Sequence, residues 1–134
     1  MKRTSPVVLA ALLLLVSVLM PVTAFAETLD QRTARLVPHL IVTRPEGDGP
    51  FPVVFMLHGC GGQRPFQDGM AEVALRAGAA VVQIDSFGPR RIGRASAIAL
   101  VCTGMRLHGR ERAGDLYAAM SWARTQSWAD AARF

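Results

Sequence analysis

Lysine is almost absent from this chain of 134 residues, because Lys2 is the only one and every other basic side chain is an arginine. The arginines are scattered and interleaved with acidic residues, so no basic block of the kind that binds nucleic acid is present. A DNA or RNA partner is therefore not expected. Repeats and low-complexity tracts are also absent, and the length suits one small domain.

The first 26 residues carry a secretory signal pattern. Lys2 and Arg3 precede an uncharged, apolar run that reaches residue 26 and ends in Ala-Phe-Ala, which predicts cleavage between Ala26 and Glu27. An uncleaved membrane anchor is the alternative, because the run is just long enough to span a bilayer. Pro21 and the small residues at the exit favour cleavage, so we expect an exported protein, periplasmic or secreted, without a membrane anchor.

Cysteine occurs only twice, as Cys60 and Cys102, and no Cys-x-x-Cys motif or closely spaced histidine pair is present. A metal site is therefore not expected. In an exported chain, an even number of cysteines makes a Cys60–Cys102 disulfide a candidate. Two free thiols remain the alternative.

Apolar patterns predict strands that alternate with helices. The run Val53 to Leu57 is unbroken, which is typical of a strand buried on both faces of a parallel sheet. Helical spacing predicts a helix that Gly78 ends, with its apolar face formed by Phe66, Met70, Val73, Ala74 and Ala77. A second parallel strand is expected over 79–84. The last helix is expected over 110–126, with an apolar face of Ala113, Leu116, Tyr117, Met120, Trp122 and Ala123.

The rest of the mature chain is less regular. Residues 27–34 are polar and predict an extended N-terminal arm. Residues 35–43 predict one or two short strands, which Pro38 confines to a sheet edge. Residues 91–109 have no clear period and predict a long loop over the top of the sheet. The fold class is therefore α/β, a mostly parallel sheet with an antiparallel N-terminal edge, in a domain that spans 35–134.

A donor-rich loop follows the apolar strand: His58, Gly59, Cys60, Gly61 and Gly62. Glycines let the backbone turn sharply and bring bare N–H groups close to a ligand. The pattern has the form of the oxyanion loop of lipases and esterases, in which such groups stabilise a developing negative charge. A tight turn that binds nothing is the structural alternative. In this setting His58 is expected to bond back to the loop backbone rather than to act as a base.

Three stretches, 52–62, 81–90 and 109–123, occur in an order and at spacings that resemble the dienelactone hydrolase branch of the α/β-hydrolase superfamily. The resemblance covers about residues 35–134. It implies hydrolysis of a small carboxylic ester or lactone by a nucleophile–His–Asp triad, without a metal or other cofactor. It also implies that the full fold is the α/β-hydrolase fold.

The chain departs from this family at the catalytic residues. A nucleophile elbow, Gly-x-Ser-x-Gly or its cysteine form, should follow the strand after the last helix, and Phe134 is reached first. We therefore expect the N-terminal portion of a hydrolase, truncated before the elbow and inactive alone. The Val53–Leu57 strand would then form an exposed edge with unpaired backbone groups, so marginal stability is expected.

Other residues offer weaker candidates for the missing chemistry. Cys60 could be a nucleophile with His58 as base and Asp85 as orienting group, but its position matches the oxyanion loop instead. Ser86 is expected to shape a strand-end loop, and Ser121 lies in mid-helix. His39 and His108 have no patterned partners and are expected to be structural or on the surface.

Asp85 and Arg90 lie at the same sheet edge as the glycine loop, where an arginine could clamp a substrate carboxylate. A solvated loop with local ion pairs is the other interpretation, and it is the one that we favour. Two functions remain open for the chain: the scaffold and oxyanion loop of an ester or lactone hydrolase, or an exported, non-enzymatic binding or partner module. Neither the ester nor the oligomeric state follows from the sequence.

Overall fold

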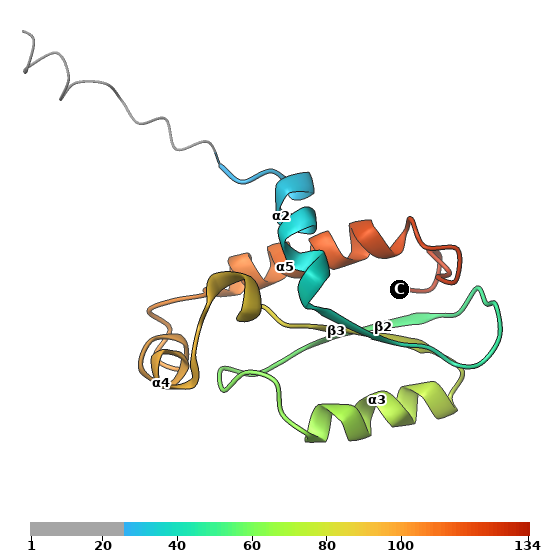
Figure 1. The fold of residues 1–134 in the computed structure, drawn as a ribbon, viewed down its shortest axis with the longest axis horizontal. Coiled ribbons are helices and arrows are strands. Elements are labelled where there is room, and N and C mark those ends of the chain that lie inside the picture. Colours follow the sequence, from blue (N-terminus) through green and yellow to red (C-terminus); the bar gives the residue numbers. More distant parts are fainter. Residues whose placement is uncertain (1–25) are drawn as a thin grey trace, which may run out of the picture.

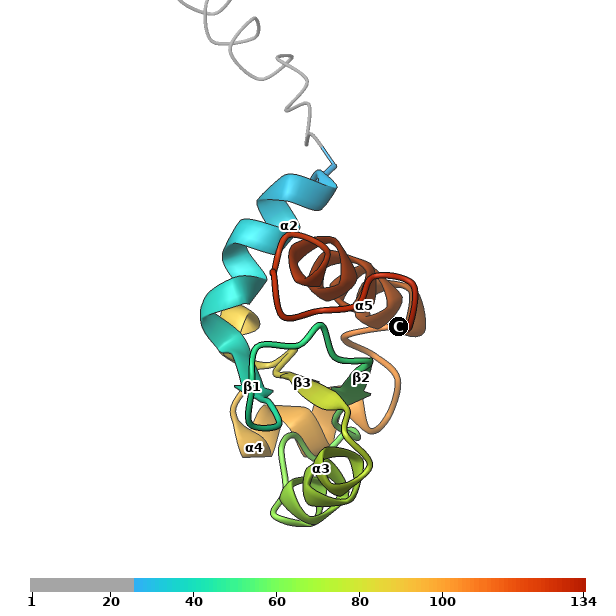
Figure 2. The ribbon, with the colours of Figure 1, turned by 90° about the vertical axis from the view of Figure 1, so that its right-hand side faces the viewer.

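The computed structural model describes residues 26–134, so the predicted signal segment, apart from Ala26, lies outside the described residues. The described chain forms three layers (Figure 1). Helices α2 (Leu29–Leu36) and α5 (Gly109–Ala123) cover one face of a three-stranded sheet, and α3 (Phe66–Arg76) covers the other (Figure 2). Within these residues, no helix has the length and apolar character needed to cross a membrane.

The sheet is mixed, with the strand order β1-β3-β2. Strand β1 (Leu40–Thr43) runs antiparallel to β3 (Ala80–Ile84), with Leu40 opposite Ile84. Strand β2 (Val53–Leu57) runs parallel to β3, with Val53 opposite Ala80. The expected mixed α/β arrangement with an antiparallel N-terminal edge is therefore present, and α3 connects the two parallel strands. The sheet is not mostly parallel, because one of the two strand pairs in residues 26–134 is antiparallel.

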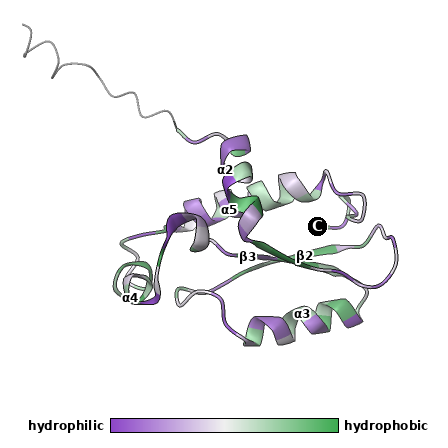
Figure 3. Ribbon diagram, in the orientation of Figure 1, coloured by the Kyte–Doolittle hydropathy of each residue, from purple (hydrophilic) through white to green (hydrophobic). Residues whose placement is uncertain are grey.

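The central strand is β3, and the apolar strand β2 lies at the edge of the sheet, as the sequence predicts. Every residue of β3 is buried, whereas β2 is an edge strand, which pairs with β3 on one side only. Val54 of β2 is 40% exposed. The prediction that β2 is buried on both faces is therefore wrong, although Figure 3 shows how apolar this strand is.

The start of β2 is paired on its outer side by the C-terminal segment. Phe51 N–H donates to the Trp128 carbonyl at 2.7 Å, and Val53 N–H donates to the Arg133 carbonyl at 2.9 Å. The Phe134 ring meets the Phe55 ring edge-on, with centroids 5.2 Å apart. The C-terminal segment thus lies beside the start of β2 and runs parallel to it at the Phe51–Ala129 bridge.

Residues 27–34 are not an extended arm, because most of them belong to α2. The helix begins with a capping box, in which Thr28 Oγ1 accepts from Gln31 N–H and the Gln31 side chain accepts from Thr28 N–H. After α2, a 3₁₀ turn over Val37–His39 leads into β1, so Pro38 lies before the strand and does not interrupt it. Leu36 is buried in the core, so α2 is part of the domain.

The buried face of α3 differs from the predicted one, and that of α5 agrees only in part, because the predicted Ala123 is buried and Leu116 and Trp122 pack against the core. In α3, Phe66, Met70 and Val73 are all more than half exposed, and the buried positions are Gln67 and Ala71. Helix α5 leaves Tyr117 exposed and buries Asp115, Ala118, Ala119 and Ala123. Spacing identifies apolar positions on a helix, but it does not identify which of them a neighbouring layer covers.

Residues 88–107 form a compact segment rather than an irregular loop. A 3₁₀ turn, η2 (Gly88–Arg90), is followed by the short α4 (Arg94–Ser96) and by the π-helical turn η3 (Ala97–Val101). The segment has a small core of its own, formed by Phe87, Ile92, Ala97, Val101 and Leu107. It packs beside the carboxyl ends of β2 and β3, where the candidate site lies (Figure 1).

Candidate functional site

The glycine loop leaves the carboxyl end of β2 as a tight turn. Gly62 N–H donates to the Gly59 carbonyl at 3.1 Å, which closes the turn around Cys60 and Gly61. Gly62 has a φ of +81°, and a Cβ added there would lie 3.2 Å from the Phe87 ring. Glycine is therefore needed at position 62 for both its backbone conformation and the close approach of Phe87.

His58 anchors the loop from inside and is almost fully buried. Its Nδ1 lies 2.7 Å from the Gly59 carbonyl, and its Nε2 lies 3.2 Å from the Ser86 N–H. A carbonyl only accepts and an N–H only donates, so this geometry corresponds to a neutral imidazole protonated on Nδ1. Asp85 Oδ1 is 3.7 Å from Nε2, but that nitrogen already accepts from Ser86. His58 is thus a structural residue, as the sequence predicts.

The middle of the loop is at least partly exposed, and its two backbone N–H groups have no acceptor within residues 26–134. Cys60 is exposed and Gly61 is partly exposed. Their N–H groups donate to no backbone acceptor within residues 26–134, where the recorded loop bond runs from Gly62 to Gly59. Free N–H groups at the carboxyl end of a strand are what an oxyanion site requires.

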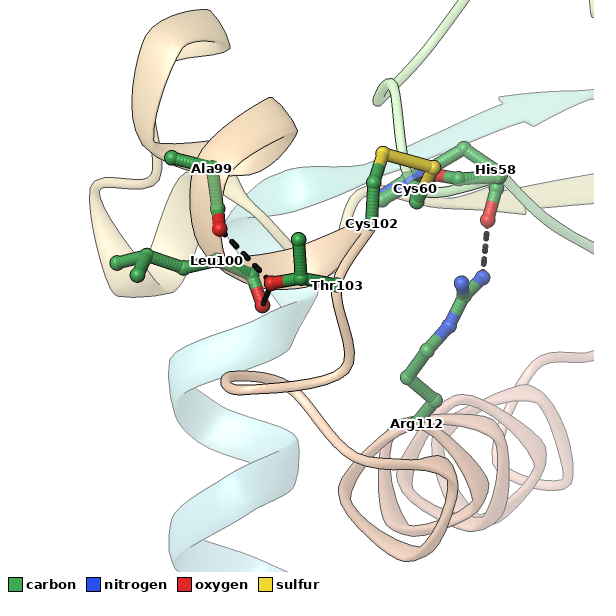
Figure 4. The surroundings of a disulfide bond; sticks show 8 residues. His58, Cys60, Ala99, Leu100, Cys102, Thr103 and Arg112 are labelled. Carbon is green, nitrogen blue, oxygen red and sulfur yellow. Dashed lines mark hydrogen bonds between the residues drawn. A yellow bond between two sulfur atoms is a disulfide. The ribbon is translucent and has the colours of Figure 1, made fainter.

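A disulfide holds the loop from the outside. The structure joins Cys60 to Cys102, the pairing that the sequence predicts, with 5.0 Å between the Cα atoms and a sequence separation of 42 residues (Figure 4). Cys102 follows η3, so the bridge ties the glycine loop to the compact 88–107 segment. Thr103, the residue after Cys102, stabilises the end of η3, because its hydroxyl donates to the Ala99 carbonyl at 2.8 Å.

Two arginines, one from α5 and one from the loop after β3, hydrogen-bond to backbone carbonyls beside the glycine loop. Arg112 of α5 donates to the His58 carbonyl, which lies immediately before the loop glycines (Figure 4). Burial lowers the pKa of Arg112, and the neighbouring Asp115 acts against this shift. Arg90 donates to the Ser86 carbonyl at 2.8 Å. The carboxyl ends of β2 and β3 are thus each fixed by a guanidinium group.

Asp115 is the centre of a buried ion-pair network. Its carboxylate, with no exposed side-chain area, accepts two hydrogen bonds from Arg90, at 2.7 and 2.9 Å, and one from Arg32 of α2 at 3.1 Å. Burial alone would raise the pKa of Asp115, but the hydrogen bonds and charge of the arginines outweigh burial and lower it. The network connects α2, α5 and the turn after β3 that contains Arg90.

Asp85 and Arg90 do not form the predicted substrate clamp. Asp85 Oδ1 accepts from the Phe87 and Gly88 N–H groups, at 2.9 and 3.1 Å, and so closes its own loop. Arg90 is committed to Asp115 and to the Ser86 carbonyl. Local ion pairs and turn contacts therefore describe Arg90 and the Oδ1 atom of Asp85. Asp85 Oδ2 accepts no hydrogen bond from residues 26–134, and the Asp85 side chain is 30% exposed.

The weaker nucleophile candidates are also occupied or enclosed. Cys60 has no thiol, because its sulfur is in the disulfide. Ser86 is fully buried, and Ser121 lies in the last turn of α5 rather than in mid-helix. His108 caps the N-terminus of α5, and His39 lies in the 3₁₀ turn before β1. None of these five residues combines an accessible nucleophile with a base.

Sequence reasoning missed Arg112, Asp115 and Arg32, because a contact network between distant segments leaves no local motif.

Within residues 26–134, no group of three or more histidine, cysteine or carboxylate side chains is placed to hold a metal ion. Comparison with models of known protein families and with curated proteins finds no match for the chain.

Proposed function

We propose that residues 58–62 are the oxyanion loop of an ester or lactone hydrolase of the dienelactone hydrolase type, and that this chain supplies the scaffold for the loop without a nucleophile. One observation carries the proposal: the N–H groups of Cys60 and Gly61 donate to no acceptor within residues 26–134, and both residues are at least partly exposed at the carboxyl end of β2. The disulfide on one side and Arg112 on the other hold these donors in place before any ligand arrives.

Such a loop lowers the energy of a tetrahedral intermediate, whose carbonyl oxygen becomes negatively charged. Fixed donors act most strongly when they need no reorganisation, and each contributes about 3 kcal/mol in enzymes that use them. The attacking group must come from a further segment beside the loop. The outer edge of β2 is suited to that segment, because Phe55 and Leu57, like Val53, direct their backbone groups away from β3.

The donor role can be tested with methylphosphonate, whose oxygens mimic the charge of the tetrahedral intermediate. Titration into ¹⁵N-labelled protein should produce saturable shifts of the Cys60 and Gly61 amide signals, while amides of α3 stay unchanged. Shifts that are absent, or that spread evenly over the arginine-rich surface, would contradict the proposal.

A matched pair of glycine variants makes the titration specific. Gly62→Ala forces a side chain against Phe87 at a φ of +81°, whereas Gly78→Ala meets the same backbone strain, at a φ of +79°, in open space. Gly62→Ala should weaken the methylphosphonate response and Gly78→Ala should preserve it. Equal responses of the two variants would show that the geometry of the loop does not determine binding.

A binding or partner module is the second candidate, and the apolar surface favours it. Val54 of β2 and Phe66, Met70 and Val73 of α3 are exposed although they are large and apolar. Exposed apolar groups on an edge strand and a nearby helix are typical of a protein interface. Under this candidate, substitution of these residues with lysine abolishes partner binding. The unmodified protein should also show no saturable shifts on titration with methylphosphonate.

A further inference from the structure

Arg64, just after the glycine loop, places its guanidinium group against Gly61. A Cβ added at Gly61 would lie 3.4 Å from Arg64 Nη2 and 3.6 Å from Arg64 Nε. Since a Cβ lies about 2.5 Å from the amide nitrogen of its own residue, Arg64 Nη2 is no more than about 6 Å from the Gly61 nitrogen. Hydrogen bonds of about 2.9 Å from both groups can therefore reach the same small ligand.

The charge of Arg64 is available, unlike that of the other two arginines beside the loop. Arg112 donates to the His58 carbonyl, and Arg90 is bonded to Asp115. The Arg64 guanidinium, in contrast, donates to no acceptor and forms no ion pair within residues 26–134. Its side chain is exposed, so a ligand at the loop can contact it.

A buried glutamine holds the backbone that carries Arg64. Gln67 is 2% exposed, and its Oε1 accepts from the Arg64 N–H at 2.9 Å. In the opposite direction, the Gln67 N–H donates to the Arg64 carbonyl at 3.0 Å. These two bonds fix Arg64 at the N-terminus of α3, so its side chain begins from a defined position beside the loop.

The segment that follows the loop has more donors than acceptors. Gln63 Nε2 and Gln67 Nε2 are buried and have no hydrogen-bond partner among residues 26–134. Unpaired buried donors are unfavourable, and they leave the positive ends of both amide dipoles uncancelled. The N-terminus of α3 adds partial positive charge, and Asp68, the acidic residue of its first turn, accepts from Gln83 of β3. The surroundings of Arg64 therefore favour a negatively charged ligand.

We propose that Arg64 is a binding residue of the oxyanion site, and that its guanidinium acts together with the Cys60 and Gly61 N–H groups on the charged oxygens of one ligand. The inference rests on the proposed function, because it adds a residue to the same site. Backbone N–H groups also bind a neutral carbonyl oxygen, whereas a guanidinium gains most from a negative oxygen. Arg64 thus makes the site select for negative charge.

The test measures the binding constant of methylphosphonate for the native ¹⁵N-labelled protein, Arg64→Gln and Arg76→Gln, from the Cys60 and Gly61 amide shifts. Arg64→Gln removes the charge and keeps the backbone N–H that bonds to Gln67. Arg76→Gln removes the same charge at the other end of α3, from a side chain that is 69% exposed. Binding should weaken about fivefold in Arg64→Gln, as expected for an exposed charge, and stay unchanged in Arg76→Gln. No loss in Arg64→Gln, or an equal loss in both variants, would overturn the role of Arg64.

Salt gives a second measurement that a purely structural role of Arg64 would not change. Because exposed charges are screened, raising sodium chloride from about 0.02 to about 0.3 M should weaken methylphosphonate binding more in the native protein than in Arg64→Gln. An equal salt dependence would contradict the proposal. Native binding that Arg64→Gln leaves unchanged refutes the role of Arg64 and retains the oxyanion loop, whereas a native protein without saturable shifts refutes both.

Discussion

Breaking the Cys60–Cys102 bridge should lower the free energy of unfolding by about 4 kcal/mol. The bridge closes a loop between residues 42 apart, and in the chain-entropy treatment a loop of this length destabilises the unfolded state by about that amount. Both cysteines are exposed, so a reductant can reach the bridge in the folded protein. Urea denaturation with and without a phosphine reductant measures the difference.

The double variant Cys60→Ala with Cys102→Ala is the control for this measurement. It should have the stability of the reduced protein, and the reductant should not change it further. A loss smaller than about 1 kcal/mol on reduction would mean that the unfolded chain gains little freedom from cleavage, or that the folded loop is strained by the bridge.

Asp115→Asn is expected to cost about 3–5 kcal/mol of stability at neutral pH, because it leaves Arg90 and Arg32 without their shared counter-charge in a buried site. Asp48→Asn removes a carboxylate from an exposed turn, and a change of no more than about 0.5 kcal/mol is expected there. Urea denaturation of both variants at pH 7 separates the buried network from a general charge effect.

The effect of Asp115→Asn should depend on pH in a defined direction. The folded-state pKa of Asp115 lies below its ordinary value of 3.8, so its stabilising contribution is complete above that value and is lost as the pH falls through the folded-state pKa. The stability difference between the native protein and Asp115→Asn should therefore be constant near neutral pH and shrink in acid. A difference that grows in acid would contradict this account of the network.

The parts of the fold that the sequence predicted are those with a local cause. The turn at Gly59–Gly62, the inward bond of His58 and the end of α3 at Gly78 depend on the conformational freedom of glycine or on neighbouring groups. The strand β1 followed from a short apolar run, whereas Pro38, which was expected to confine a strand over 35–43 to the sheet edge, lies in the turn before it. The capping box at Thr28 was a local signal too, and reading it would have replaced the expected arm with α2.

The parts that could not be predicted depend on what covers each surface. Val53–Leu57 is as apolar as a central strand, yet its outer edge is paired with Arg133 only at its start. Phe66, Met70 and Val73 have helical spacing, and the structure leaves them exposed. The partners of Arg90 and Arg112 come from distant segments, so a substrate clamp at Arg90 looked as reasonable in the sequence as the ion pair that is present.

The central proposal is that residues 58–62 form an oxyanion loop, while residues 26–134 hold no group placed to attack a carbonyl. The most direct test is hydrolysis of p-nitrophenyl acetate by the purified, oxidised polypeptide, measured beside the Cys60→Ser variant and a buffer blank. The account predicts that both proteins hydrolyse the ester no faster than exposed surface groups do, with no difference between them. Saturable turnover by the native chain that disappears in Cys60→Ser would contradict it.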